Sequence, residues 1–194
     1  MYINLYLYVL EAVLTKMTVS SRNSNLLDRM IRAIKNEDSL YEEVEHDPVA
    51  SKQGLYIIAL VSVCQAIGRG LETVIAGRPI DNILTTGIFG FIETIVGLAV
   101  WSYVLYFIGG RIMKATVTPP EVWRCTGFAR SSGIFFIIPY IGPFINIWIL
   151  LAYLKAGKQA LNLSTGKTLL AVLISAIPFI LIQGYLIIFL SQIF

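Results

Sequence analysis

The sequence predicts an all-α integral membrane protein with about five transmembrane helices. Its 194 residues are 56% hydrophobic and only 14% charged, and the mean hydropathy is +0.73, whereas an ordinary soluble domain is about 25% charged. The charges are also segregated, because Asp and Glu concentrate before residue 48 and uncharged runs fill much of the remainder. We therefore divide the chain into N-terminal surface segments, 1–48, and a membrane domain, 49–194.

The first sixteen residues allow two interpretations. The stretch MYINLYLYVLEAVL lacks the basic start of a signal peptide, carries Glu11, and has no small-residue cleavage site after its apolar run. Met17 could be the biological start, in which case these residues are an upstream extension. Otherwise they form an apolar helix that lies at the membrane surface or against a neighbouring chain.

Residues 26–35 predict a short amphipathic helix. Its apolar face consists of Leu27, Met30, Ile31 and Ile34. Its other side carries the basic residues Arg29, Arg32 and Lys35. Such a helix suits the headgroup region of an anionic leaflet on the cytoplasmic side. The alternative is a helix that packs on the cytoplasmic surface of the protein itself.

An acidic helix is predicted next, in SLYEEVEHDP. The acidic side chains of this region are Glu37, Asp38, Glu42, Glu43, Glu45 and Asp47. They lack the alternating spacing of a calcium loop, and Asp47 is placed to cap the following helix. They form either a solvated helix face or a surface for a basic partner, and pairing with Arg124 or Arg130 is a further possibility. The candidate contact residues are Tyr41, Glu42, Glu43 and Asp47.

Three long apolar stretches, 49–68, 83–108 and 168–191, predict the first, second and last spans. Twenty residues of helix cover about 30 Å, the thickness of the hydrocarbon core. The second stretch is longer than this and should tilt or protrude. The last contains Pro178, where we expect a kink.

Residues 131–151 are apolar but are interrupted by Pro139–Pro143, and they form either one kinked span or a hairpin of two. With a hairpin, 13 Lys and Arg residues lie on the N-terminal side and two, Arg69 and Arg78, on the other. With a single crossing, the split is ten against five. The positive-inside rule favours the hairpin and a cytoplasmic N-terminus. We therefore predict short third and fourth spans at about 126–140 and 143–160, although each arm is only about 18 Å long between Arg130 and Lys155.

Several fragments together resemble the Yip1-domain family. They are YEEVEHDP before the first span, WSYVLYFIGG at the end of the second, RCTGFA before the IPYIGP hairpin, and ALNLSTGKTLLAVLI entering the last span. The resemblance runs from about Leu27 to about Ile182. It implies a five-span helical membrane protein with a cytoplasmic N-terminus.

The eukaryotic relatives act in Golgi and ER vesicle traffic, bind prenylated Rab GTPases, and can influence membrane curvature. This sequence lacks the Asp-Leu-Tyr-Gly-Pro-type motif and the long N-terminal region of those relatives. It is more similar to short bacterial and archaeal members, which implies a prokaryotic cell membrane. Rab binding is therefore not carried over to this chain.

Glu93 is the most informative polar residue, because a carboxylate near the centre of a span costs roughly 2.5–3.5 kcal/mol. Gly90, Thr94 and Gly97 lie one turn away and form a small-residue face that another helix could approach. Glu93 is either a hydrogen-bonded carboxyl that locks the bundle or part of a proton or cation relay. A transporter usually shows internal repeats or further intramembrane charges, and neither is evident.

Aromatic residues cluster near the presumed span ends and the hairpin. They are Trp101, Tyr103, Tyr106, Phe135, Phe136, Tyr140, Phe144 and Trp148. Aromatic side chains settle at lipid interfaces, but they also form rigid contacts in protein interfaces. We take Tyr140 and Phe144, at the hairpin tip, as candidate partner contacts.

The sequence shows no constellation for catalysis or for a cofactor. STGKT (164–168) ends like a phosphate-binding loop, but the pattern requires glycine at Leu161. The single histidine, His46, argues against most zinc sites, and we expect no metal, no cofactor and no nucleic-acid partner.

The predicted function is that of a non-enzymatic scaffold or accessory subunit that packs against membrane lipids, other integral membrane proteins or a second copy of itself. The alternatives are a small transporter or channel that uses Glu93, and an adaptor in membrane trafficking or GTPase binding, as in the eukaryotic relatives, or one that works through the acidic helix.

Overall fold

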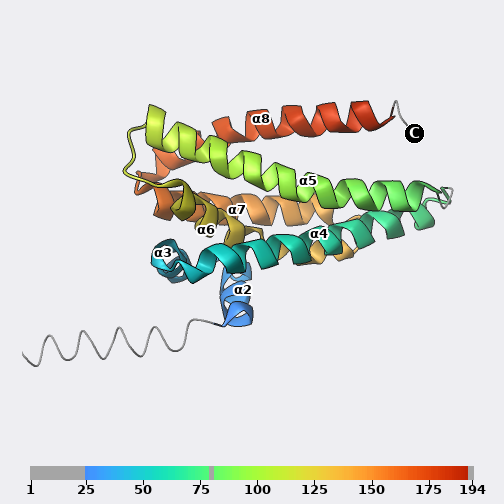
Figure 1. The fold of residues 1–194 in the computed structure, drawn as a ribbon, viewed down its shortest axis with the longest axis horizontal. Coiled ribbons are helices and arrows are strands. Elements are labelled where there is room, and N and C mark those ends of the chain that lie inside the picture. Colours follow the sequence, from blue (N-terminus) through green and yellow to red (C-terminus); the bar gives the residue numbers. More distant parts are fainter. Residues whose placement is uncertain (1–24, 79–80, 192–194) are drawn as a thin grey trace, which may run out of the picture.

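The computed structural model describes residues 25–78 and 81–191, and every regular element in this part of the chain is a helix (Figure 1). Both interpretations of the first sixteen residues concern positions outside the described residues. The helices are α2 (Leu26–Ile34), α3 (Asp38–His46), α4 (Val49–Ile75), α5 (Asp81–Tyr106), the π-helix η1 (Phe107–Ile112), α6 (Pro119–Ala129), the 3₁₀-helix η2 (Arg130–Ile137), α7 (Gly142–Leu161) and α8 (Thr165–Ser191).

Four long helices, α4, α5, α7 and α8, lie roughly along the long axis of the molecule (Figure 1). The contact between α4 and α5 is more extensive than that of any other pair of described elements. The connections at 113–118 and 162–164 lie at the end that carries α3, whereas the α4–α5 connection lies at the opposite end (Figure 1). The chain therefore runs back and forth along the bundle.

Capping side chains and a proline fix the starts of α4 and α6. The Asp47 carboxylate accepts a hydrogen bond of 2.9 Å from the Val49 backbone N–H at the start of α4, which is the capping role predicted for this residue. Thr118 and Glu121 form a reciprocal capping box at the start of α6, and Pro119 occupies its first helical position.

Glycines allow the arm formed by α6 and η2 to lie directly on α4. A Cβ atom added to Gly127 would lie 3.2 Å from the Gly54 Cα atom, so the two backbones touch where the helices cross. Farther along, a Cβ at Gly68 would fall on the carbonyl group of Phe136. Gly68 was predicted to end the first span, but α4 continues to Ile75. Its role is close approach rather than helix termination.

The arm itself changes helix type halfway. The predicted third span, 126–140, begins inside α6 and continues through the eight-residue 3₁₀-helix η2. Runs of 3₁₀-helix longer than three or four residues are uncommon. In η2, Ser131, Ser132 and Gly133 are buried, and a Cβ on Gly133 would meet the Val61 side chain. Contact with α4 holds this segment in place.

By length and composition alone, two helices could cross a membrane, Val49–Ile75 and Gly87–Ile112. A third candidate combines Gly142–Leu161 with Thr165–Pro178, two segments that meet at a bend of 117°. These helices fit a membrane protein, as predicted, and the count of five spans stays a prediction. On its own α7 is less apolar, because it carries Asn146, Lys155 and Lys158.

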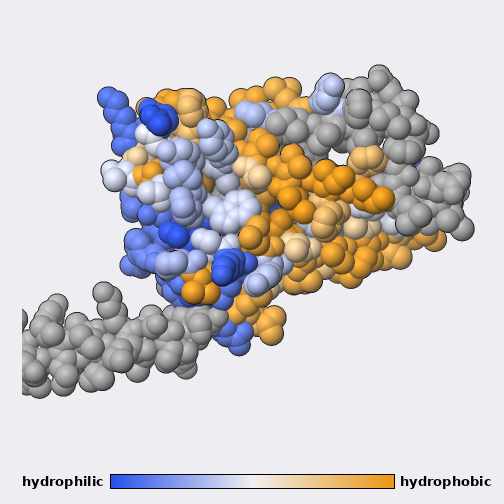
Figure 2. All heavy atoms as spheres, viewed as in Figure 1, coloured by the Kyte–Doolittle hydropathy of each residue, from blue (hydrophilic) through white to orange (hydrophobic). Residues whose placement is uncertain are grey.

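The surface is divided into a polar end and an apolar body. Figure 2 shows hydrophilic side chains at the end that carries α3, and hydrophobic ones over most of the rest of the described surface on this face. Near the polar end, the side chains of Leu40, Tyr41, Phe128, Leu105 and Leu161 are fully buried. Large apolar side chains elsewhere on the long helices face outward. Exposure of so many apolar side chains to water would cost free energy, whereas such side chains are expected on a surface that faces the lipid bilayer.

Candidate functional site

The acidic residues of α3 are held by two arginines of α2. Arg29 is buried, with 3% of the residue exposed. Its Nε donates to Glu43 Oε1 over 2.8 Å, its Nη2 lies 2.7 Å from Asp47 Oδ2, and its Nη1 donates to Gln53 Oε1 over 2.6 Å. Arg29 therefore ties α2 to α3 and to the first turns of α4.

Arg32 completes this network from the same helix. Its Nη1 donates to Glu43 Oε2 over 2.6 Å, and its Nε donates to Glu37 Oε2 over 3.2 Å. Burial opposes the charge of Arg32, but Glu43 and Glu37 outweigh it and raise the pKa of this side chain. The two arginines of the basic face thus pair within the protein, whereas Lys35 is exposed. The exposed apolar side chains of α2 are Leu27 and Ile31.

The four candidate contact residues of the acidic helix do not share one surface. Tyr41 is fully buried, and Glu43 and Asp47 are engaged by Arg29. Only Glu42 is exposed. Burial raises the pKa of the Tyr41 phenol, whose hydroxyl has no hydrogen-bond partner among the described residues.

The helices α2 and α3 are also docked on α6 and α7. Arg124 donates to the main-chain carbonyl of Glu45, so it contacts the backbone of the acidic helix, and Gln159 Nε2 donates to the Glu45 carboxylate over 3.0 Å. Lys155 lies 3.0 Å from Asp38 Oδ1. The indole of Trp148 donates to the carbonyl of Ile34 over 2.8 Å. The N-terminal helices form a fixed cap on one end of the bundle.

The small-residue face of α5 lies against α4. A Cβ at Gly90 would lie 3.2 Å from Arg69 Cδ, and Gly97 is buried on the same helix. The Thr94 hydroxyl lies 2.8 Å from both Gln65 Oε1 and the Gly90 carbonyl oxygen. Glu93 lies in α5, but its side chain is outside the described part of the structure. The helix that approaches this face therefore belongs to the same chain.

Tyr140 and Phe144 stand at the tip of the hairpin, 60% and 73% exposed. The backbone of Tyr140 has a φ of +64°, in the left-handed region that non-glycine residues rarely adopt. Its N–H donates to Glu72 Oε1 of α4 over 2.8 Å. The turn is thus anchored to α4, while its aromatic rings point outward.

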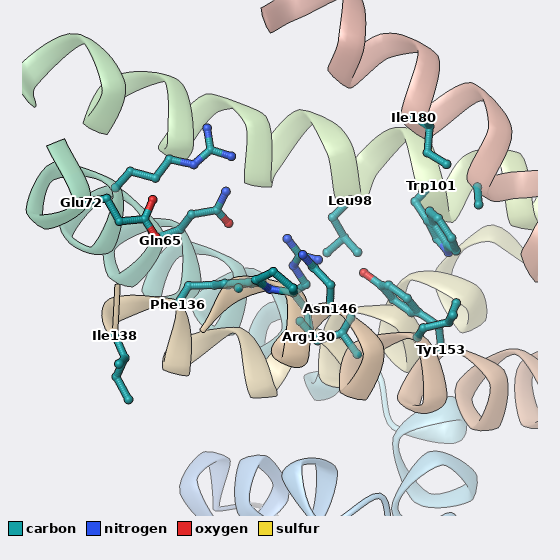
Figure 3. Close-up of a pocket in the computed structure, with 16 residues that line it drawn as sticks. Gln65, Glu72, Leu98, Trp101, Arg130, Phe136, Ile138, Asn146, Tyr153 and Ile180 are labelled. Atoms are coloured by element: carbon teal, nitrogen blue, oxygen red, sulfur yellow. The ribbon is translucent and has the colours of Figure 1, made fainter. Parts of the chain in front are cut away.

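A cleft of about 620 Å³ opens between α4, α5, η2, α7 and α8. Its polar lining comes from Gln65, Arg69, Glu72, Arg130, Asn146 and Tyr153. The Tyr153 ring stacks on Trp101 at 5.0 Å between centroids. Figure 3 shows the Tyr153 hydroxyl pointing toward Arg130 and Asn146. These charged and amide groups line a cleft in the apolar body of the molecule.

Sequence reasoning missed this cleft because it placed both arginines in loops. Arg69 follows Gly68, which looked like a helix end, and Arg130 precedes an apolar run. In the structure Arg69 lies in the sixth turn of α4 and Arg130 at the junction of α6 and η2. The available signal was the apolar sequence on both sides of Arg130, which is typical of a charge inside a span.

The sequence matches the family model of the Yip1 domain over residues 33–188. The chain belongs to the Yip1-domain family. This family consists of membrane proteins that interact with other membrane proteins and is not known as an enzyme family. Searches of curated proteins and of solved structures found no match. The family resemblance predicted from the sequence is confirmed.

Proposed function

We propose that this Yip1-domain protein is a five-span scaffold or accessory subunit of a membrane assembly, with its N-terminal cap on the cytoplasmic side of a prokaryotic cell membrane. The observation that supports this proposal most directly is the exposure of two aromatic side chains at the tip of the hairpin. Tyr140 and Phe144 are exposed on a turn that Glu72 fixes in place. Aromatic side chains on a rigid support are the usual anchors of protein interfaces.

The polar end supports the assignment of sides. The cap of α2 and α3 lies at the same end as residues 113–118 and 162–164 (Figure 1). Arg29, Arg32 and Lys35 belong to the cap or follow it directly, and Lys114 lies in the 113–118 connection. Positive residues mark the cytoplasmic side. The α2 helix crosses the direction of the bundle (Figure 1), so Leu27 and Ile31 are suited to the headgroup region of the inner leaflet.

The acidic helix is a weaker candidate for a partner surface. Two of its four proposed contact residues, Glu43 and Asp47, pair with Arg29 and Arg32 of the same chain, and Tyr41 is buried. A basic partner would have to displace these internal contacts. The hairpin tip requires no such displacement, and it is the site that we assign to a second membrane protein or to a second copy of this chain.

The double variant Tyr140→Leu/Phe144→Leu tests this assignment. It keeps apolar side chains at the tip but removes the rings and the phenol. We expect an intact helical bundle that no longer co-elutes with its partner, or that becomes monomeric if the partner is a second copy. Size-exclusion chromatography with light scattering in mild detergent measures both results. The matched control is Phe107→Leu, an exposed aromatic position at the other end of the bundle. A double variant that keeps every partner would refute the tip as an interface.

The transporter alternative has a separate test. Reconstituted protein that shows a proton- or cation-dependent flux, with the flux lost in Glu93→Gln, would favour a relay through α5. The scaffold proposal expects no such flux, and it expects Glu93→Gln to preserve the assembly because the amide keeps the shape and hydrogen bonding of the carboxyl.

A further inference from the structure

Arg130 places a charged group within the apolar bundle. It begins η2, directly after the buried residues Phe128 and Ala129 and before the buried Ser131. The Arg130 Nε is buried and has no hydrogen-bond partner among the described residues. Its guanidinium lies 5.4 Å from the centroid of the Phe136 ring. A guanidinium inside a membrane protein is costly unless an anion or several acceptors satisfy it.

The surroundings of Arg130 supply few acceptors of their own. Tyr153 and Asn146 point their polar ends toward it (Figure 3). Both are neutral groups that can donate as well as accept. Glu72, the carboxylate of the cleft, lies beside Gln65 at the other side of this view (Figure 3) and accepts the bond from the Tyr140 backbone. Among the described residues, Arg130 forms no salt bridge, and the groups that contact it are the neutral Tyr153 hydroxyl and the Phe136 ring.

The remaining wall of the cleft is apolar and reaches the outer surface. Ile138, Leu150 and Ile180 line it, and all three are exposed. They belong to the part of the molecule that carries outward-facing apolar side chains. A ligand can thus reach the cleft sideways from the hydrocarbon region, and its volume lies within the roughly 300–1,000 Å³ of ordinary ligand sites.

We propose that this cleft binds an anionic phospholipid. The phosphate lies at the Arg130 guanidinium, whose planar fork matches phosphate oxygens. The Tyr153 hydroxyl and the Asn146 amide donate to the same group. Its acyl chains lie against the apolar wall, where Ile138 and Ile180 stand on opposite sides of Arg130 (Figure 3) and Leu150 adds to the lining. Cationic ligands do not suit a site that contains Arg130, and an uncharged lipid would leave this charge without a counter-ion among the described residues.

The test measures lipid binding to the full-length protein in detergent. Native mass spectrometry is used to titrate phosphatidylglycerol, the anionic probe, against phosphatidylcholine. We expect the wild type to prefer phosphatidylglycerol, and Arg130→Gln to weaken that binding about tenfold or more because a charge-assisted contact is lost. Arg111→Gln, an exposed arginine outside the cleft, should bind as the wild type does.

A second variant separates a lipid from free phosphate. Leu150→Trp narrows the apolar wall and keeps Arg130, so it should reduce phosphatidylglycerol binding while the protein stays folded. Tyr153→Phe removes one donor and should weaken binding by a smaller factor. Inorganic phosphate is added in competition with the lipid. Displacement of the lipid by phosphate, with Leu150→Trp binding phosphate as the wild type does, would assign the site to a free anion and overturn the proposal. So would unchanged lipid binding in both Leu150→Trp and Arg130→Gln.

If Arg130→Gln does not fold, Leu150→Trp and Tyr153→Phe still decide the question. Circular dichroism and elution volume identify such a failure. The lipid site and the scaffold role fail separately, because loss of partners in the hairpin-tip variant and loss of phosphatidylglycerol in the cleft variants are independent measurements.

Discussion

Arg29 shows how a single side chain can join three helices. It reaches Glu43 on α3, Asp47 at the end of that helix, and Gln53 in α4, all within 2.8 Å. These contacts are short and shielded, because the side chain of Arg29 is 4% exposed and that of Glu43 is 13% exposed. Removal of one member of such a cluster leaves the other charges partly buried and without a partner.

We expect Arg29→Met to lower the free energy of unfolding by about 3 kcal/mol, the lower end of the range for breaking a buried ion pair. The lower end applies because Asp47 still reaches water. Chemical unfolding in detergent micelles measures the change. Lys35→Met, at an exposed position of the next turn, should stay within about 0.5 kcal/mol of the wild type. Equal stability of the two variants would show that the cluster does not fix the cap.

The burial of Tyr41 allows a prediction about the stability of the protein at alkaline pH. Burial raises the pKa of its phenol in the folded protein, whereas an unfolded tyrosine ionises near pH 10. Ionisation of Tyr41 therefore costs more free energy in the folded state than in the unfolded state. The free energy of unfolding keeps its full value below about pH 10 and decreases as the pH rises further. Thermal unfolding of the wild type should shift to lower temperature above about pH 10.

Tyr41→Phe should reduce this alkaline shift. At neutral pH the variant should be as stable as the wild type or more stable, because it removes a buried hydroxyl without a partner among the described residues. The comparison uses the unfolding temperatures of the wild type and the variant at neutral pH and above about pH 10, measured in the same detergent. An alkaline shift of undiminished size in the variant would assign the effect to other groups.

At the scale of elements, the contact between α4 and the arm of α6 and η2 decides how the hairpin sits. The two backbones meet at Gly54 and Gly127, and the Phe136 carbonyl lies on Gly68. Side chains at these glycines would separate the helices. The arm then could not reach far enough for Tyr140 to bond with Glu72 near the end of α4.

Gly127→Ala should destabilise the protein by about 1–3 kcal/mol, because the backbone atom opposite the new methyl group cannot yield as a flexible side chain does. Gly68→Ala should cost more, since its methyl group would meet a carbonyl. Gly166→Ala is the matched control: no atom lies within 4 Å of its Cβ position in α8. This control should be neutral or stabilising by up to about 1 kcal/mol. Thermal unfolding of the three variants ranks them, and a reversed order would contradict close contact of these helices.

At the scale of the whole molecule, the structure makes a prediction about topology. Residues 113–118 and 162–164 lie at the end that carries the N-terminal cap, and residues 76–78 lie at the opposite end (Figure 1). If the bundle crosses the bilayer along its long axis, the first two segments are cytoplasmic and the third is outside.

Single cysteines at Thr116, Ser164 and Ala76, in a background with Cys64→Ala and Cys125→Ala, test this arrangement. All three chosen positions are exposed. A membrane-impermeant maleimide added to intact cells should label position 76 alone, and positions 116 and 164 only after the membrane is opened. Labelling of position 164 but not 116 in intact cells would exclude the hairpin and favour a single crossing by residues 131–154.

The sequence by itself determined the helical membrane class, the family and the approximate positions of the long helices. These follow from local properties: apolar runs of sufficient length, the segregation of charge, and capping residues such as Asp47. The Pro139–Pro143 interruption also marked a turn. Local properties gave a wrong prediction where one residue type has two uses. Glycine occurs at helix ends and also where two helices pack closely, and Gly68 was predicted as a helix end although it allows close packing.

Only the tertiary structure decided what the charged residues do. Arg29 contacts Glu43, 14 residues away in the sequence. Lys155 donates to the carbonyl of Asn36, 119 residues away. The cleft brings together Gln65, Arg130 and Tyr153. Whether a charge is solvated, paired or enclosed depends on which segments pack around it. Each contact between distant segments depends on where every other helix lies. These contacts therefore cannot be predicted from a short segment of the sequence.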